Sequence, residues 1–129
     1  HVSRRKAKSG KLSVFKGREA RLNKAIFHIL ALKGPLTIYD IHKEVIAQRG
    51  LRHTRYASVN KRVRFLEESG YIKKIGIKKT KAGFKAAIYE LTVRAYLAII
   101  LNIINLDDLL MRVDEPTAQT ILATILQAT

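Results

Sequence analysis

The 129-residue sequence predicts a mainly α-helical fold that contains one small β-hairpin and ends in added C-terminal helices. Three observations lead to this fold class. Apolar residues recur at helical spacing in three successive segments, each followed by a glycine. Two segments of β-branched and aromatic residues then flank a short basic loop, which is the pattern of a hairpin. A long apolar stretch beginning at residue 93 favours further helices.

Residues 1–17 are predicted to form a flexible basic arm. Leu12, Val14 and Phe15 are its sizeable apolar residues, and they can dock the end of the arm on the following domain. Whether the basic part is a solvated tail or contacts DNA stays open at this stage. The basic residues available for such a contact are Arg4, Arg5, Lys6, Lys8 and Lys11.

Three helices come next, and each is followed by a glycine. Glycine tolerates the left-handed backbone conformation that commonly ends a helix. Thr37 and Thr54 precede the second and third helices and are suitable N-caps, because a hydroxyl oxygen can accept a hydrogen bond from a free backbone N–H. The helices are expected over residues 18–33, 38–49 and 55–69, followed by Gly34, Gly50 and Gly70.

A β-hairpin is expected after the third helix, with strands over residues 71–78 and 86–92. Gly83 lies in the connecting loop and supplies the turn. Phe84 is expected to pack back against the domain, although a wedge or stacking role stays open. Four lysines surround the loop and can contact phosphates or a minor groove: Lys78, Lys79, Lys81 and Lys85.

Residues 93–129 are interpreted as a helical dimerisation segment. An apolar helix running from Val93 to Leu106 is expected, then a break at residues 114–117 and a last helix over 116–127. The first helix is apolar in nearly every direction, so it needs burial on most sides. A homodimer is the favoured solution, and folding back within one chain is the alternative. The residues assigned to the contact are Tyr96, Leu97, Ile100, Leu101, Ile103 and Ile104.

The net charge of +15 is the strongest indication of function. Residues 1–92 hold 23 basic and 6 acidic residues, whereas residues 93–129 hold 2 basic and 4 acidic ones. A small protein this basic most often binds a polyanion. A membrane-spanning segment is not expected, because the longest apolar stretch, residues 95–106, is shorter than the roughly 20 residues that a span requires.

Catalytic and metal-binding functions are not favoured by the sequence. Cysteine is absent, so neither a thiolate metal site nor a cysteine nucleophile is available. The four histidines show no ligand spacing, and no glycine-rich phosphate loop is present. Glu67 and Glu68 fit the end of a helix better than an acid–base pair. We therefore expect no enzyme activity and no cofactor.

The segment Ser58-Val-Asn-Lys-Arg-Val-Arg-Phe-Leu-Glu-Glu-Ser-Gly-Tyr-Ile72 resembles the recognition helix of winged helix-turn-helix regulators and its passage into the wing. Ala86-Ala-Ile-Tyr-Glu-Leu-Thr92 resembles the returning wing strand. The resemblance covers about residues 18–92 and is to MarR-like and PadR-like transcriptional regulators. It implies a winged-helix DNA-binding domain over 18–92.

The third helix offers a surface for reading DNA. Val59, Val63 and Leu66 share one face. Polar and basic residues occupy the opposite face and its flanks. Such a helix fits the major groove, where arginine can read guanine and asparagine can read adenine. The residues assigned to this contact are Thr54, Arg55, Ser58, Asn60, Lys61, Arg62 and Arg64.

The sequence therefore predicts a double-stranded DNA-binding transcriptional regulator that forms a homodimer. Its expected location is the cytoplasm, associated with the nucleoid if the source is prokaryotic. Two alternatives remain: a ribosome-associated winged-helix protein that binds structured RNA, and a winged helix that serves as a protein-interaction module.

Overall fold

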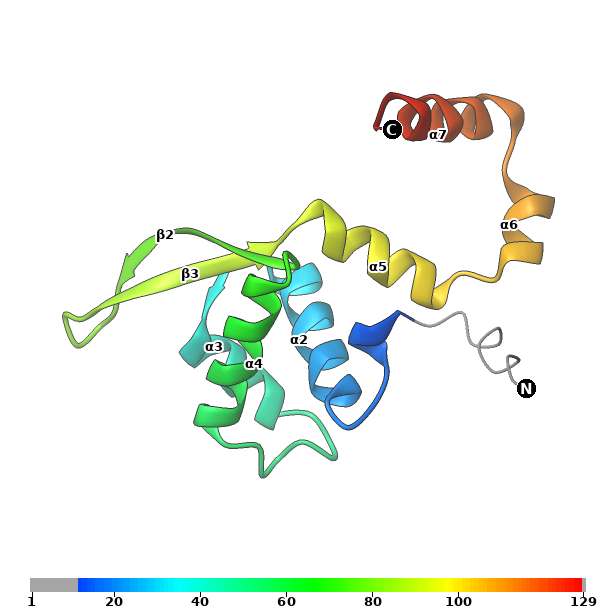
Figure 1. Ribbon diagram of the computed structural model, residues 1–129. Helices are drawn as coiled ribbons and strands as arrows, with labels where there is room; N and C mark the ends of the chain where they lie inside the picture. The colour runs from blue at the N-terminus through cyan, green and yellow to red at the C-terminus, as the bar shows by residue number, and fades with distance from the viewer. Residues whose placement is uncertain (1–11, 129) are drawn as a thin grey trace.

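The computed structural model describes residues 12–128, so the arm residues Arg4, Arg5, Lys6, Lys8 and Lys11 lie outside the described part. Residues 12–92, here called the body, comprise three packed helices and a small sheet. Residues 93–128, the C-terminal segment, add three helices that extend away from the body (Figure 1). The elements are η1 (Ser13–Phe15), α2 (Ala20–Lys33), β1 (Leu36–Thr37), α3 (Ile38–Ile46), α4 (Tyr56–Glu68), β2 (Ile72–Lys79), β3 (Lys85–Leu91), α5 (Val93–Ile103), α6 (Leu106–Arg112) and α7 (Glu115–Ala128).

The end of α4 shows how the sequence fixes a helix boundary. Gly70 has a φ of +85°, which a glycine adopts without the steric cost that a side chain brings. The N–H of Gly70 donates to the carbonyl of Glu67 at 3.0 Å, and the N–H of Tyr71 donates to that of Leu66 at 2.8 Å. This pair of bonds is the Schellman motif. It ends α4 and turns the chain into β2.

The two predicted N-caps have different outcomes. Thr37 caps α3, because its hydroxyl oxygen accepts a hydrogen bond from the N–H of Asp40 at 3.1 Å. The prediction for Thr54 is wrong: α4 begins at Tyr56, and its N-cap is Arg55, which makes no side-chain capping bond. The second helix is also shorter than predicted. It ends at Ile46, and a turn carries the chain on to Gly50.

The sheet has the strand order β1-β3-β2, and both pairings are antiparallel. The two residues of β1 pair with the base of β3, Leu36 with Tyr89 and Thr37 with Ile88. The predicted hairpin forms β2 and β3, with a register shift at Ile75. Beyond that shift the two strands run outward as a two-stranded ribbon, the wing (Figure 1).

The core lies where α2, α3, α4 and the base of the sheet meet. Phe27, Ile41 and Leu66 are fully buried, one from each helix. Val14 and Phe15 are buried as well. The Phe15 ring contacts the Phe27 ring edge-on, with 5.7 Å between the ring centroids. The prediction that the end of the arm docks on the domain that follows it is therefore confirmed for these two residues, whereas Leu12 stays exposed.

Thr92 fixes the start of α5 against the body. Its hydroxyl donates to the carbonyl of Gly70 at 2.6 Å and accepts from the N–H of Ala95 at 3.3 Å. Only Ala95 and Ala98 of α5 are buried. The body therefore covers a single side of this helix.

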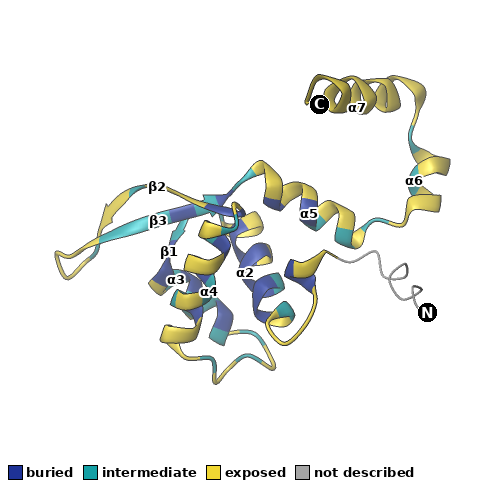
Figure 2. Cartoon of the chain, viewed as in Figure 1, coloured by how far each residue is buried: buried dark blue, intermediate teal, exposed yellow. Residues whose placement is uncertain are grey.

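The predicted helix from Val93 to Leu106 is divided in two. It ends at Ile103, and Asn105 caps the new helix α6 by accepting from the N–H groups of Asp107 and Asp108 at 2.9 and 3.2 Å. Asparagine is a strong N-cap, and acidic residues in a first turn face the positive helix end. Neither α6 nor α7 has a buried residue, as Figure 2 shows.

No helix among residues 12–128 combines the length and hydropathy needed to cross a bilayer.

Candidate nucleic-acid interface

Helix α4 presents one polar and basic face to solvent because its other face is held in the core. Val59, Val63 and Leu66 are completely buried and fix the rotation of the helix about its axis. Figure 2 shows the outward surface of α4 exposed along its length. The predicted inward stripe is confirmed, and the opposite face is free to meet a ligand.

The structure brings most of the predicted reading residues together on this face. Arg55, Ser58, Lys61 and Arg64 are exposed. Asn60 is half-buried, and its Oδ1 accepts a hydrogen bond from Nε of Arg64 at 3.4 Å, so these two side chains form a unit one helical turn apart. Thr54 is half-buried and lies before the helix begins. These residues span the N-terminal half and the middle of α4.

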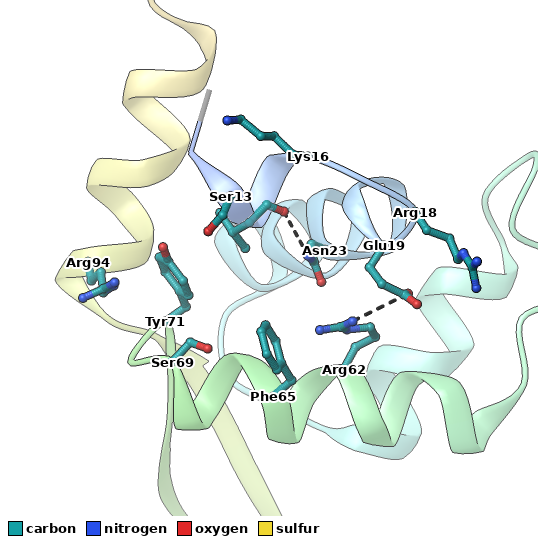
Figure 3. A pocket seen from close by; sticks show the side chains of 11 residues that line it. Ser13, Lys16, Arg18, Glu19, Asn23, Arg62, Phe65, Ser69, Tyr71 and Arg94 are labelled. Carbon is teal, nitrogen blue, oxygen red and sulfur yellow. Dashed lines mark hydrogen bonds and ion pairs between the residues drawn. The ribbon is translucent and has the colours of Figure 1, made fainter. Parts of the chain in front are cut away.

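Arg62 is the exception. Its side chain is only 14% exposed, and Nη1 lies 3.7 Å from Oε1 of Glu19, at the start of α2. The guanidinium also covers the ring of Phe65 at 4.4 Å from the ring centroid. Figure 3 shows Arg62 directed toward α2. The structure therefore does not bring Arg62 onto the exposed face that carries Lys61 and Arg64.

His42 contacts the start of α4, which the sequence did not reveal. Its Nε2 lies 2.8 Å from the carbonyl oxygen of Thr54. Its ring contacts the Tyr56 ring edge-on, with 5.7 Å between the ring centroids. These contacts connect α3 with the first residue of α4 and hold the intervening turn. The histidine lies twelve residues from its hydrogen-bond partner, so no local motif identifies the contact.

The wing is the second basic surface. All four predicted wing residues, Lys78, Lys79, Lys81 and Lys85, are exposed. Phe84 corrects an expectation: it is 72% exposed and does not pack back on the body. The hairpin turn is instead held locally, by a hydrogen bond from the N–H of Phe84 to Oγ1 of Thr80 at 3.1 Å.

Other exposed basic residues lie near the start of α4. Arg52 and His53 are exposed in the turn before the helix. On α3, the ammonium of Lys43 lies 5.8 Å from the ring centroid of Tyr39, and both residues are exposed. Arg52 and His53 add positive charge directly before α4.

The C-terminal segment forms a different surface, which is apolar. Ile100 is 46% exposed, Leu101 59% and Ile103 69%, and α6 and α7 add exposed Leu110, Met111 and other aliphatic side chains. Tyr96 and Leu97 are exposed too, whereas Ile104 is half-buried. Isolated apolar residues on a surface are ordinary, but here each of the three helices of the segment exposes several of them.

A metal centre has no support in the part of the chain that the structure describes. No three His, Asp or Glu side chains among residues 12–128 lie close enough together to hold an ion.

Comparisons with known proteins identify the fold. No family model and no curated protein matches the sequence. Among solved structures, Bacillus subtilis PadR in complex with operator DNA is similar with a TM-score of 0.54 and 18% identity, covering 87% of this chain and 62% of that one.

Two other solved structures agree. A PadR-like transcriptional regulator from Bacillus cereus gives a TM-score of 0.53 at 14% identity, covering 90% of this chain and 98% of that one. The diamide-treated YodB from B. subtilis gives 0.51 at 19% identity, covering 70% and 77%. At these identities the comparisons establish the fold, which is the winged helix of these regulators, with added C-terminal helices.

Proposed function

We propose that this protein is a sequence-specific, double-stranded DNA-binding transcriptional regulator that acts as a homodimer. The observation that carries the proposal is the outward face of α4, where Arg55, Ser58, Lys61 and Arg64 are exposed on a helix held rigidly by its buried side. A solved protein of the same fold, PadR, is bound to operator DNA. The proposal extends that mode of binding to this chain.

The recognition step is the entry of α4 into the major groove. That groove is wide enough for one helix, and the N-terminal residues of a recognition helix usually contact base edges. Arg55 and Ser58 occupy that end of α4. Arg64 can read guanine through a bidentate contact and Asn60 can read adenine. Because Asn60 and Arg64 are hydrogen-bonded to each other, we expect them to read adjacent positions together.

The wing supplies affinity without sequence preference. Its exposed lysines can lie along the phosphate backbone or enter the adjacent minor groove, where contacts position a protein on the duplex. Contacts of this kind release counterions and give binding a steep dependence on salt. The basic arm, residues 1–17, can add further phosphate contacts of the same kind.

Dimerisation follows from the C-terminal segment. Its exposed aliphatic side chains need a partner, and its 2 basic and 4 acidic residues make a nearly neutral surface between two strongly basic bodies. A two-fold pair of winged domains fits a pseudo-palindromic site whose half-sites lie about one helical turn apart.

The experiment is a selection of bound sequences from random duplex DNA, followed by titrations at several salt concentrations with duplex RNA as competitor. If about six phosphates are neutralised per protomer, the logarithm of affinity should fall with the logarithm of salt at a slope near −5. An enriched duplex motif with two half-sites supports the proposal. A flat salt response, or preferential binding of RNA, would reject it.

A further inference from the structure

The turn of the wing exposes an aromatic side chain that the body does not cover. Phe84 belongs to the segment that connects β2 with β3, and this segment lies at the far end of the wing (Figure 1). The side chain is 72% exposed, so most of its surface makes no contact with residues 12–128. Covering an aromatic ring is favourable, and this ring is therefore available to a partner.

The turn holds Phe84 through both of its backbone polar groups. The N–H of Phe84 donates to Oγ1 of Thr80 at 3.1 Å, and the carbonyl of Phe84 accepts from the N–H of Thr80 at 2.7 Å. The N–H of Gly83 donates to the carbonyl of Thr80 at 2.9 Å. The ring is thus attached to a fixed turn, and little conformational entropy is lost when it contacts a partner.

The charge around the turn indicates the nature of that partner. Residues 72–89 contain six lysines and no acidic residue. Lys73, at the base of the wing, pairs with Glu90 at 3.5 Å. The other ion pairs of the described residues involve neither Lys79 nor Lys85. These two lysines lie directly opposite each other on β2 and β3, and like charges so placed destabilise a hairpin. A polyanion relieves this repulsion, so phosphates are the surroundings that the turn favours.

The length of the wing matches the spacing of the grooves in a duplex. The wing leaves the body beyond the register shift at Ile75. Residues 76–80 extend it by about 16 Å, at roughly 3.3 Å per residue. The centres of adjacent major and minor grooves are about 17 Å apart along a duplex, which is half of one helical turn. With α4 in the major groove, the turn of the wing can reach the adjacent minor groove.

We propose that Phe84 enters this minor groove as an apolar wedge and partly separates two stacked base pairs, a proposal that rests on the proposed DNA-binding function. The lysines beside the ring contact the phosphates that flank the groove. Wedges of this kind kink a duplex by about 20–90° toward the major groove. Pyrimidine–purine steps unstack easily, so the ring adds a preference for such a step without a hydrogen bond to any base. The lysines alone carry no sequence preference.

The test uses the full chain and duplexes that contain the motif enriched by selection. 2-Aminopurine, whose fluorescence rises when the base unstacks, replaces each base of the flanking half-turn in successive duplexes and locates the step under the wing. Two further duplexes then carry TA or AT at that step, which present the same acceptors in the minor groove but differ in stacking. We expect a fluorescence rise at one step, a bend in end-to-end energy transfer, and binding of the TA duplex at least about fivefold tighter.

Variants of the wing separate the effect of the ring from that of charge. Phe84→Ala should abolish the fluorescence rise and the preference for TA, whereas Phe84→Leu keeps an apolar wedge and should retain most of both. Ile77→Ala is the matched control, because it removes another exposed apolar side chain, nearer the body, and should change neither. Lys81→Ala should weaken binding to the two duplexes equally. All three side chains are exposed, so each variant is expected to fold.

Three results would overturn the wedge: an unchanged preference for TA in Phe84→Ala, equal losses in Phe84→Ala and Ile77→Ala, or dissociation of the dimer by Phe84→Ala, which would place the ring against a partner chain. Tighter binding of single-stranded than of duplex DNA, lost in Phe84→Ala, would identify a stacking platform instead. Salt-dependent duplex binding without an unstacked step would overturn the wedge and keep the proposed function. A chain that binds no duplex would overturn both.

Discussion

Helices α2 and α7 each have 14 residues and carry isoleucine and leucine at helical spacing, yet they have opposite surroundings. In α2, Ile26, Leu30 and five other residues are buried, whereas α7 has no buried residue. The difference lies in what surrounds each helix. The body supplies partners for α2 from within the chain, whereas every residue of α7 is exposed. Helical periodicity alone does not tell these cases apart.

Charge divides the molecule in the same way. The basic residues are concentrated in residues 1–92, and every buried apolar side chain of the described residues except Ala95 and Ala98 lies in this part as well. The C-terminal segment has few charges and exposes its apolar side chains. This division suggests two tasks: the body binds a polyanion, and the C-terminal segment binds another copy of itself.

The largest expected effect is on assembly. Replacing both Ile100 and Ile104 with Asp should dissociate the proposed dimer, because each carboxylate would have to be buried without a partner, at a cost of several kcal/mol. Sedimentation equilibrium should then give a mass near 14.6 kDa, instead of twice that value for the unchanged chain. The body should stay folded, since it does not need these side chains.

Gln119→Asp is the matched control for this prediction. It adds one carboxylate, where the double variant adds two, at an exposed polar position of α7, and it should leave the dimer intact. A single-chain mass for the unchanged protein at micromolar concentration would contradict the division of tasks, and α7 would then need another partner.

The next effect is on the core of the body. Leu66→Ala removes a fully buried side chain of α4 and should lower the free energy of unfolding by about 2–5 kcal/mol. Leu32→Ala makes the same change at a residue that is 85% exposed and should alter it by less than about 0.5 kcal/mol. Urea denaturation measures both. Equal losses would mean that Leu32 is covered in solution and that the body has a further interface.

The fold could be predicted wherever local chemistry decides the structure. Thr37 and Gly70 are such positions, and the stripe ending at Leu66 follows from periodicity alone. Where contacts between residues far apart in the sequence determine the position of a side chain, the sequence did not predict it. Arg62 falls within a basic run on α4, but its pairing with Glu19 turns it away from the exposed face that carries Lys61 and Arg64.

At two other positions the structure differs from the prediction because two tendencies oppose each other. At Asn105, the apolar pattern favours continuing the helix, but the capping side chain ends it and starts α6. At Phe84, hydrophobicity favours burial, but the wing extends too far from the body for the ring to reach it (Figure 1). A cavity lined by Asn23, Arg62 and Arg94 could not be anticipated either, because its walls come from η1, α2, α4 and α5.

A smaller effect should distinguish the two basic surfaces of the body. Arg64→Ala and Asn60→Ala should each cost about 1–3 kcal/mol at the selected DNA site and relax its sequence preference. Lys79→Ala and Lys81→Ala should weaken binding to all duplexes about equally. Fluorescence anisotropy with selected and scrambled duplexes measures both quantities. If the wing variants change sequence preference and the α4 variants do not, the wing is the reading element.

The smallest effect concerns how α2 and α7 begin. No side-chain hydrogen bond caps α2, whose start is held by packing. At α7, Oδ1 of Asp114 accepts from the N–H of Thr117 at 2.8 Å. Hydrogen bonds from the Thr117 side chain and backbone lower the pKa of this carboxyl below its ordinary value. The bond is therefore fully present above the ordinary pKa and is lost as the pH falls through the lowered one.

Asp114→Asn isolates this contribution, because it keeps an acceptor oxygen that does not titrate. In the unchanged chain, the amide resonance of Thr117 should move as the pH falls from about 6 to 2, with a midpoint below the ordinary aspartate value. In the variant it should stay nearly constant. The same movement in both proteins would show that the start of α7 responds to a more distant event, such as dissociation of the C-terminal segments. The start of α7 would then depend on its partner chain as the start of α2 depends on the core.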